Sequence, residues 1–372
     1  MIQYTATCLF GLEALLGAEI DALGCKRIST IDGRVTFEGD ALAAARANIG
    51  LRYAERVYIN LGSFAATTFT ELFDGTHALP WEEYIGTCDA FPVKGHAIKS
   101  TLFSVPDCQK IVKKAIADRL GQKYGMKTLP ETGIKYQVEF FILKDTASLM
   151  IDTSGVPLHK RGYRPETVAA PLRETLAAAL AAFSRPREDV ILRDPFCGSG
   201  TIAIEGAMQM LKIAPGVGRS FAAEQFAAFP RELWDTAREE ARDMVIRDSA
   251  FMALASDIDT ECVRIATEAA ARAGVSDHVK VFEANALDIE TGDRRGTVVT
   301  NPPYGERLMR PEEAEQLYRD MGRAFARLGR WQIYVLTPCE TFERLYGRRA
   351  DKVRKLYNGM IPCLFYQYFK NK

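Results

Sequence analysis

The sequence lacks the residues on which several large classes of protein depend. Its eight cysteines include no C-x-x-C pair, and its four histidines are scattered along the chain. We therefore expect no zinc site or other metal centre, and reduced cysteines in a cytoplasmic protein are the simpler interpretation. No apolar run approaches the roughly 20 residues that a membrane-spanning helix requires. The N-terminus has neither a basic lead-in nor a long apolar core, so we expect no signal peptide.

The chain also lacks an excess of charge of either sign, because 48 basic residues balance 48 acidic ones. This balance weighs against a protein that coats nucleic acid over its whole surface, although local clusters matter more. Residues 94–127 hold eight lysines and arginines against two aspartates, and residues 344–355 hold six against one. Taken alone, each cluster is most simply a solvated face.

With 372 residues, the chain is long enough for two or three domains. The part up to about residue 164 mixes helices and strands without regular alternation. The residue patterns predict helices over 12–24 and 105–125, strands over 34–39 and 96–103, and a hairpin over 136–155. This mixture favours α+β subdomains over a doubly wound sheet.

In the second half of the chain, predicted strands and helices alternate regularly. Short apolar strands are predicted at 190–194, 251–256, 279–283, 296–300 and 331–337, with helical stretches between them. That alternation predicts an α/β fold with a mostly parallel sheet and helices on both faces. The end of the chain, 352–369, reads as two strands joined by Asn358-Gly359, a typical hairpin turn. We therefore expect the last strand to run antiparallel.

A glycine-containing loop, DPFCGSG at 194–200, follows the first of these strands. Gly198 and Gly200 permit a tight turn and close approach of a ligand to the backbone. A helix is predicted from Thr201, and its first N–H groups favour anionic groups. The loop matches neither G-x-G-x-x-G nor a GK[ST] motif, and Asp194 would repel a phosphate. A cationic or amine-bearing ligand is the better match.

The next three strand ends also carry polar side chains. Asp257 is placed to accept hydrogen bonds from ribose hydroxyls, whereas Asp259 is predicted to cap the following helix. Asn285 could bind an adenine edge beside the backbone N–H of Ala286, or be an ordinary turn residue. Asn301 follows the fourth strand. Polar residues of this kind at four successive strand ends would be improbable by chance.

The motif NPPY at 301–304 is a stiff turn, because each proline disfavours the helical region for the residue before it. Together, these motifs resemble those of the class I S-adenosylmethionine-dependent methyltransferases, with a Rossmann-like sheet. In that family, NPPY is specific to methyl transfer onto planar amino groups. The resemblance implies that Asn301, Pro302, Pro303 and Tyr304 are catalytic, and that S-adenosylmethionine is the cofactor. The cofactor-binding residues would be Asp194, Phe196, Cys197, Gly198, Gly200, Thr201, Asp257, Ile258, Asn285 and Ala286.

The resemblance can be narrowed from the class I methyltransferases to one bacterial family. Residues 158–180, 213–226 and 354–369 look like the bacterial family related to the N-terminal half of the 23S rRNA guanine-N2 methyltransferase, and 98–120 looks like a THUMP core. This implies a ferredoxin-like subdomain at 1–63, a THUMP RNA-binding domain at 64–157 and a methyltransferase domain at 158–372. By analogy, Pro171 and Leu172 would line the cofactor pocket. The RNA-binding candidates are Lys99, Lys110, Lys113, Lys114, Lys160 and Arg161, with Arg164 beside them.

The resemblance implies methyl transfer to an exocyclic amine of an RNA base, with guanine N2 of 23S rRNA, or of a large-subunit precursor, as the substrate. Asn301 and the Pro302 carbonyl would accept the amine N–H bonds, and Tyr304 would stack on a base flipped out of its helix. Three alternatives remain open: an N6-adenine methyltransferase acting on DNA or RNA, a protein glutamine methyltransferase, and a non-catalytic RNA-binding ribosome-assembly factor.

Overall fold

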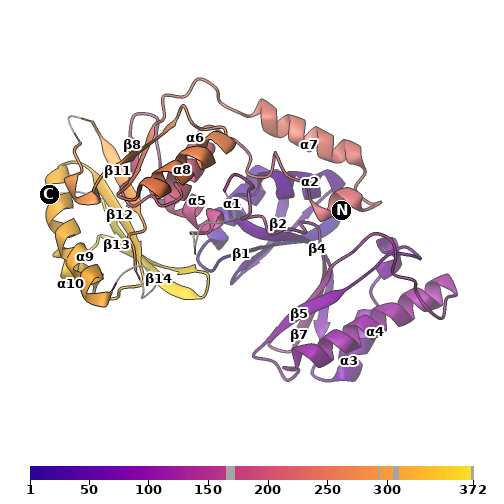
Figure 1. Cartoon of the computed structure of the whole chain (residues 1–372). Coiled ribbons are helices and arrows are strands. Elements are labelled where there is room, and N and C mark those ends of the chain that lie inside the picture. The colour runs from indigo at the N-terminus through magenta and orange to yellow at the C-terminus, as the bar shows by residue number, and fades with distance from the viewer. Residues whose placement is uncertain (165–171, 292–293, 305–309, 370–372) are drawn as a thin grey trace. The chain divides into compact units, whose positions relative to one another are not determined.

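The computed structural model describes residues 1–164, 172–291, 294–304 and 310–369. The chain forms two compact units (Figure 1), which we describe separately. The first comprises Met1–Cys8, Gly17–Leu158 and Ser220–Glu239, and the second comprises Leu9–Leu16, His159–Arg219 and Glu240–Lys372. The units are therefore interleaved along the chain.

The first unit is built on a seven-stranded sheet in the order β2-β3-β1-β4-β7-β6-β5. Its strands are β1 (Ile2–Cys8), β2 (Lys26–Ile31), β3 (Arg34–Gly39), β4 (Ala54–Ala65), β5 (Val93–Ile98), β6 (Val138–Leu143) and β7 (Thr146–Asp152). All neighbouring strands are antiparallel except β5 and β6. The pairing of β4 with β7 joins both predicted N-terminal subdomains into one sheet.

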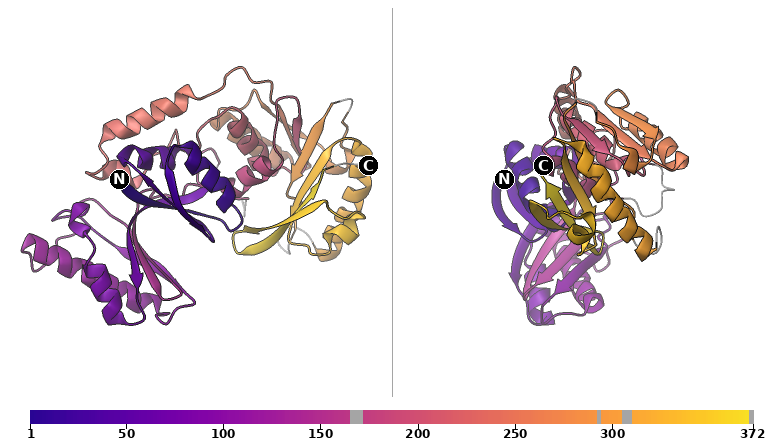
Figure 2. Two further views of the ribbon diagram at one scale, coloured as in Figure 1. Left: turned by 180° about the vertical axis from the view of Figure 1, so that it is seen from behind. Right: turned by 90° about the vertical axis from the view of Figure 1, so that its left-hand side faces the viewer.

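The first unit contains the helices α2 (Ala41–Gly50), α3 (Phe69–His77) and α4 (Val105–Tyr124), and most of α1 (Glu13–Ala22) and α7 (Arg231–Asp243). Helix α4 packs beside α3 and ends at Gly125, which has a φ of 67° (Figure 1). Seen from behind, the two helices again lie together beside the β5–β7 strands (Figure 2). This mixture of helices and antiparallel strands confirms the expected α+β module.

Two features of the first unit differ from expectation. The predicted strand over 96–103 ends at Ile98, because Lys99 has a φ of 48° and turns the chain out of the sheet. The segment Ser220–Glu239 packs on this unit, although it follows the glycine loop in sequence. Ala223 donates its N–H to the Thr153 carbonyl at 3.0 Å, and the rings of Phe226 and Tyr136 stack at 4.1 Å.

The second unit contains a seven-stranded sheet in the order β10-β9-β8-β11-β12-β14-β13. Its strands are β8 (Ile191–Asp194), β9 (Ala253–Asp257), β10 (Val279–Glu283), β11 (Gly296–Thr300), β12 (Gln332–Thr337), β13 (Lys352–Asn358) and β14 (Ile361–Tyr368). The first five strands in that order are parallel, and β14 runs antiparallel to both β12 and β13. The prediction of a mostly parallel sheet closed by an antiparallel hairpin is confirmed.

Helices lie on both faces of this sheet: α5 (Glu174–Phe183), α6 (Thr201–Met210), α8 (Thr260–Arg272), α9 (Pro311–Phe325) and α10 (Phe342–Tyr346). Successive residues of a strand point to opposite faces. On β14, Phe365 contacts Phe183 of α5, and the next residue, Tyr366, packs on Phe342 of α10. Helices α5 and α10 therefore cover opposite faces.

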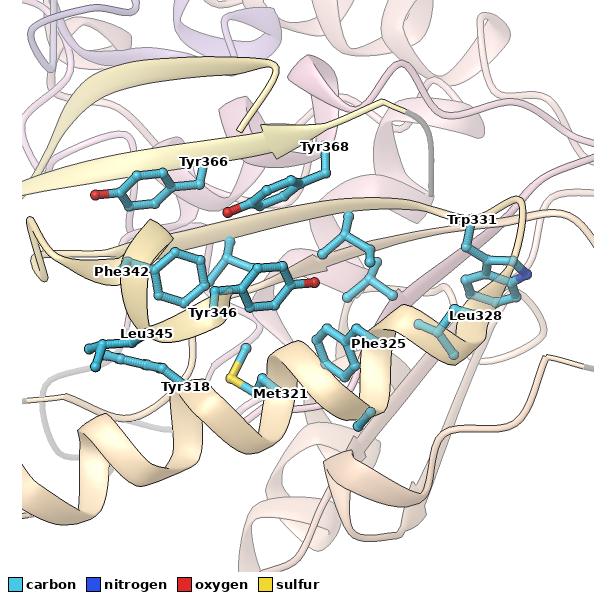
Figure 3. Packing of buried hydrophobic residues seen from close by; sticks show 14 residues of the cluster. Tyr318, Met321, Phe325, Leu328, Trp331, Phe342, Leu345, Tyr346, Tyr366 and Tyr368 are labelled. Carbon is cyan, nitrogen blue, oxygen red and sulfur yellow. The ribbon is translucent and has the colours of Figure 1, made fainter. Parts of the chain in front are cut away.

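A cluster of large buried side chains secures the antiparallel end of the sheet (Figure 3). Tyr366 and Tyr368 of β14 point toward α10, where Phe342 and Tyr346 lie against them, and Met321 and Phe325 of α9 belong to the same cluster. Fully burying side chains of this size stabilises a fold by about 1.5–3 kcal/mol each. The base of the β13–β14 hairpin is therefore firmly held, and its tip projects from a rigid support. No helix among the described residues is long and apolar enough to cross a membrane.

Candidate active site

The four polar residues predicted at strand ends come together at one edge of the second sheet. Asp194 ends β8, Asp257 ends β9, Asn285 lies two residues beyond β10, and Asn301 directly follows β11. Strands β10, β9, β8 and β11 are neighbours in that order, so their carboxyl ends share one edge. The chain order reverses between β8 and β11, and ligands of open α/β sheets bind at such switch points.

Asp194 is a buried carboxylate at this switch point. Its Oδ1 accepts a hydrogen bond from the Thr300 hydroxyl at 2.7 Å and another from the Phe196 N–H at 3.3 Å. Burial raises the pKa of Asp194 to about 7, although both hydrogen bonds act in the opposite direction. An ammonium group placed beside the carboxylate would favour its charged form. The site therefore suits an amine-bearing ligand, as the sequence predicted.

The glycine loop is tied to the next strand through its backbone. The Gly198 N–H donates to Asp257 Oδ2 at 2.9 Å, and the Asp259 N–H donates to Asp257 Oδ1 at 3.1 Å. Each carboxylate oxygen can accept a second hydrogen bond, so Asp257 retains acceptors for hydroxyl groups. A Cβ added to Gly198, whose φ is +50°, would meet no atom within 4 Å. The loop therefore exposes its backbone to open space beside Asp257.

The adjoining residues provide a surface for a flat ring. Ile258 follows Asp257, and its side chain is 72% exposed, which is unusual for isoleucine. Asn285 caps a short turn, because its Oδ1 accepts the Leu287 N–H at 3.0 Å. The group that Asn285 offers to a ligand is its Nδ2. Asp259 caps α8, as predicted, by accepting the Glu261 N–H at 2.8 Å.

Most of the other predicted cofactor residues are buried within the protein, and Phe196 is half-buried. Burial raises the pKa of the Cys197 thiol, which is therefore no nucleophile. Phe196 packs against the buried aromatic cluster, and the Thr201 hydroxyl lies 3.0 Å from that of Ser199. Leu172 is buried, as is Ala286. These side chains support the glycine loop from the interior of the protein. Pro171 lies outside the described residues.

The NPPY turn presents an acceptor without a donor. Asn301 Oδ1 is buried and has no hydrogen-bond partner among the described residues. Pro302 is buried beneath it, and Pro303 is half-buried. Such an oxygen costs roughly 1–3 kcal/mol if it stays unpaired. The rigid turn therefore holds an acceptor ready for an N–H group of a ligand.

Tyr304 is fixed by the tip of the β13–β14 hairpin. Its hydroxyl accepts a hydrogen bond from Asn358 Nδ2 at 2.9 Å and lies 3.9 Å from Cys363 Sγ. Burial raises the pKa of Tyr304 well above its usual range, so the hydroxyl stays protonated at neutral pH. Tyr304 therefore offers an oriented ring rather than a catalytic base.

Four of the predicted RNA-binding lysines are exposed: Lys99, Lys110, Lys114 and Lys160. Lys113 is half-buried, because its Nζ pairs with Glu131 at 2.6 Å and lies 3.5 Å from the centre of the Phe91 ring. The prediction for Arg161 is wrong. Its side chain is 1% exposed and its Nε lies 3.4 Å from the buried Glu205 carboxylate, so it cannot reach RNA.

Three residues acquire roles that the sequence did not reveal. Thr300 holds Asp194, and Asn358 holds Tyr304. Arg164 is not an RNA contact, because its guanidinium pairs with Glu174 at 2.7 Å and donates to the Leu172 carbonyl at 2.9 Å. The position of Thr300 before NPPY was a visible signal, whereas the other two contacts depend on tertiary packing.

Comparison with known proteins gives a consistent family assignment. Residues 161–367 match the RMKL-like methyltransferase domain, 3–58 the RlmL ferredoxin-like domain, and 66–152 the THUMP domain. The Bacillus subtilis protein YpsC, named provisionally as an RNA methyltransferase, is 46% identical over 99% of this chain and 97% of its own length. A Syntrophotalea carbinolica protein named ribosomal RNA large subunit methyltransferase K/L is 34% identical over 97% of this chain. The chain spans about half the length of this second relative, 53%.

Two solved structures are similar over nearly the whole chain. One is a Listeria monocytogenes protein described as a "predicted N6-adenine-specific DNA methylase", with a TM-score of 0.93, 47% identity and coverage of 99% of this chain and 96% of that one. The other is the methyltransferase-like protein SMU.472 in complex with SAH (S-adenosyl-L-homocysteine). It has a TM-score of 0.92 and 39% identity, and the match covers 100% of this chain and 98% of that one. From these matches and the geometry of its strand ends, the chain belongs to the RMKL-like methyltransferase family, with RlmL ferredoxin-like and THUMP domains preceding the methyltransferase domain.

Proposed function

We propose that this protein transfers a methyl group from S-adenosylmethionine to an exocyclic amine of an RNA base, and that the base is guanine, methylated at N2, in 23S rRNA. The observation that carries the proposal is the buried Oδ1 of Asn301, which has no hydrogen-bond partner in the described part of the chain and lies on a rigid turn next to Asp194. That acceptor has the chemistry to bind the N–H of a planar amine.

The residues at the sheet edge fit S-adenosylmethionine, the cofactor of this family. Asp194 would hold the methionine amino group, and the two oxygens of Asp257 would accept the ribose hydroxyls. Ile258 would cover one face of the adenine ring, and Asn285 Nδ2 would donate to its edge. The exposed backbone of Gly198 leaves room for the ligand to approach. The cofactor supplies an electrophilic methyl group on its sulfonium sulfur.

The residues of this chain would contribute to methyl transfer by orienting the amine and its base. The lone pair of an exocyclic amine is delocalised into its ring, which makes the nitrogen a poor nucleophile. Asn301 Oδ1 and the Pro302 carbonyl would accept its two N–H bonds and help the nitrogen to pyramidalise. Tyr304, fixed by Asn358, would stack on the extruded base. The described site therefore needs no nucleophilic side chain, and most of the rate enhancement would come from positioning and electrostatics.

RNA is the favoured substrate because of the first half of the chain. We assign residues 1–63 to a ferredoxin-like subdomain, 64–157 to a THUMP RNA-binding domain and 158–372 to the methyltransferase domain; the three family matches fall within these ranges. Exposed Lys110 and Lys114 on α4 would contact phosphates without reading sequence. The name of the K/L relative supports large-subunit rRNA, and a cytoplasmic location would follow.

N6-adenine is the second candidate. Its amine has the same geometry, and the description of the Listeria protein favours it. The THUMP match favours RNA over DNA in either case.

The test compares nucleosides from 23S rRNA of cells that lack this protein with those of parent cells, by mass spectrometry. We expect one N2-methylguanosine to disappear, and to return with the wild-type gene but not with Asn301→Ala. Purified Asn301→Ala should still bind SAH, which controls for folding. An unchanged 23S profile would refute the proposed substrate, and loss of N6-methyladenosine instead would establish the second candidate.

A further inference from the structure

The tip of the β13–β14 hairpin carries an exposed surface that the proposed chemistry does not use. Phe10 is 53% exposed and Met360 is 95% exposed. The ring of Phe10 meets that of Tyr357 edge-on, at 5.8 Å between centres. Lys355 Nζ lies 5.7 Å from the centre of the Tyr357 ring. Two aromatic rings and an ammonium group therefore lie together at the surface of the second unit.

Phe10 is held in place by its neighbours. Leu12 and Leu16 of the segment Leu9–Leu16 are fully buried, so the segment is anchored in the second unit. Gly11 has a φ of +91°, and a Cβ there would lie 3.1 Å from both Leu356 Cδ2 and the Lys355 carbonyl. Only glycine suits this close approach, because its φ is positive and its surroundings leave no room. The chain therefore fixes the backbone of Phe10 against the edge strand β13.

The same hairpin tip carries the contact to the NPPY turn. Asn358, which holds the Tyr304 hydroxyl, is the residue directly after Tyr357. Tyr357 and Asn358 are consecutive in β13, so their side chains point to opposite faces of the strand, and the aromatic surface and the ring of Tyr304 are attached to one turn from its two faces. The neighbouring nucleotides of a base that reaches Tyr304 would pass round the exposed tip of this hairpin to reach the aromatic surface.

The composition of the surface identifies its occupant. Residues 352–361 contain the exposed Lys352 and Lys355 and no acidic residue. Arg354 lies over the Phe183 ring on the other face of the strand, and Glu13 Oε2 accepts the Gly11 N–H beside Phe10 at 2.9 Å. Aromatic faces stack on unpaired bases whatever their sequence, and lysines bind the phosphates between them. When a base is extruded from its stack, its neighbours lose a stacking partner and expose their faces.

We propose that Phe10, Tyr357 and Lys355 form a stacking platform that binds the unpaired nucleotides next to the target base. The proposal rests on the proposed function, because it takes RNA as the substrate. It adds a binding surface outside the cofactor and amine sites, and it gives the β13–β14 hairpin a second role besides holding Tyr304.

The first test uses Phe10→Leu, which keeps an apolar side chain and removes the aromatic face. The probe is a fluorescein-labelled, unstructured 12-nucleotide RNA, and its Kd is measured by fluorescence anisotropy. We expect Phe10→Leu to raise the Kd by about fivefold or more, since stacking contributes at least about 1 kcal/mol per base. Phe10→Trp should retain the wild-type Kd. Phe369→Leu, at an exposed phenylalanine directly after β14, is the matched control and should also leave the Kd unchanged.

The second test separates this proposal from the proposed function. Methyl transfer from labelled S-adenosylmethionine to rRNA from deletion cells is measured at increasing RNA concentration. We expect Phe10→Leu to raise the KM for RNA while kcat and the Kd for SAH stay at wild-type values. If the wild type methylates rRNA and Phe10→Leu has an unchanged KM and Kd for RNA, the platform is refuted alone. If the wild type neither binds nor methylates RNA, the proposed function fails and the platform fails with it.

Discussion

The pKa of Asp194 gives a quantitative test of the cofactor site. Burial raises this pKa to about 7, so the ligand-free protein holds Asp194 mostly protonated at pH 5.5. If the ionised carboxylate binds the amino group of the cofactor, affinity must rise with pH as Asp194 loses its proton. The ionised fraction grows from about 3% at pH 5.5 to about 50% at pH 7.0. The affinity for SAH should therefore rise roughly fifteenfold over this range.

Isothermal titration calorimetry with SAH measures this rise directly, and the range below pH 7 keeps the ligand's own amino group charged. Asp194→Asn should bind weakly and show little change with pH. Thr300→Val removes the hydroxyl that donates to the carboxylate, so it should raise the pKa of Asp194 further and shift the rise to higher pH. A wild-type affinity that stays flat from pH 5.5 to 7.0 would show that the Asp194 carboxylate does not bind the amino group.

The same pKa predicts the stability of the ligand-free protein. Its folded value lies above the ordinary value of 3.8, so the folded state holds this proton more tightly than the unfolded state. The contribution of Asp194 to the free energy of unfolding should therefore fall between about pH 4 and 7 and level off above. The difference of about three pKa units corresponds to about 4 kcal/mol, as an order of magnitude. Urea unfolding of the wild type and of Asp194→Asn, compared at each pH, separates the contribution of Asp194 to the free energy of unfolding from that of the other titrating groups.

Five substitutions test the rest of the site and its surroundings. Asp257→Ala should weaken SAH binding more than tenfold in calorimetry, because the ribose acceptor and the anchor of the glycine loop are both lost. Asn358→Ala and Tyr304→Phe should each lower kcat, and the double variant should lose no more than either alone; additive losses would show that the two residues act separately. Arg161→Ala should lower the free energy of unfolding by about 3 kcal/mol in urea titrations, since the buried Glu205 carboxylate loses a cationic partner and keeps the Tyr163 hydroxyl as a donor. Asn301→Ala should melt no lower than the wild type, because an unpartnered buried oxygen stabilises nothing; a marked fall would mean that the oxygen is already hydrogen-bonded.

The strand ends were predictable from the sequence because a parallel sheet imposes its own geometry. Apolar runs identified β8, β9, β10 and β11, and the carboxyl ends of parallel strands lie on one edge. The hairpin was predictable because Asn358-Gly359 is a local turn signal. The helix-capping role of Asp259 was equally local. In each case the information lies within a few residues of the feature.

The wrong or missing predictions concern contacts between distant residues. Arg161 was counted as a surface charge because its partner, Glu205, is 44 residues away and inside α6. The hydrogen bond from Thr300 to Asp194 spans 106 positions, and that from Asn358 to Tyr304 spans 54. Charge counting along the chain cannot show which arginine is paired, because burial and pairing are set by the tertiary fold. The packing of Ser220–Glu239 on the first unit escaped prediction for the same reason.

The contact between Asn358 and Tyr304 makes the antiparallel hairpin part of the proposed active site. Two consecutive prolines directly after Asn301 can hold that residue by themselves, since the backbone of the turn has little freedom. Tyr304 lies at the far end of that turn, and an aromatic ring there would rotate without a second support. The hydrogen bond from Asn358 supplies that support, and the buried tyrosines at the base of β14 hold the hairpin in turn. A site without a nucleophile depends on such positioning, so its rigidity must come from packing outside the catalytic motif.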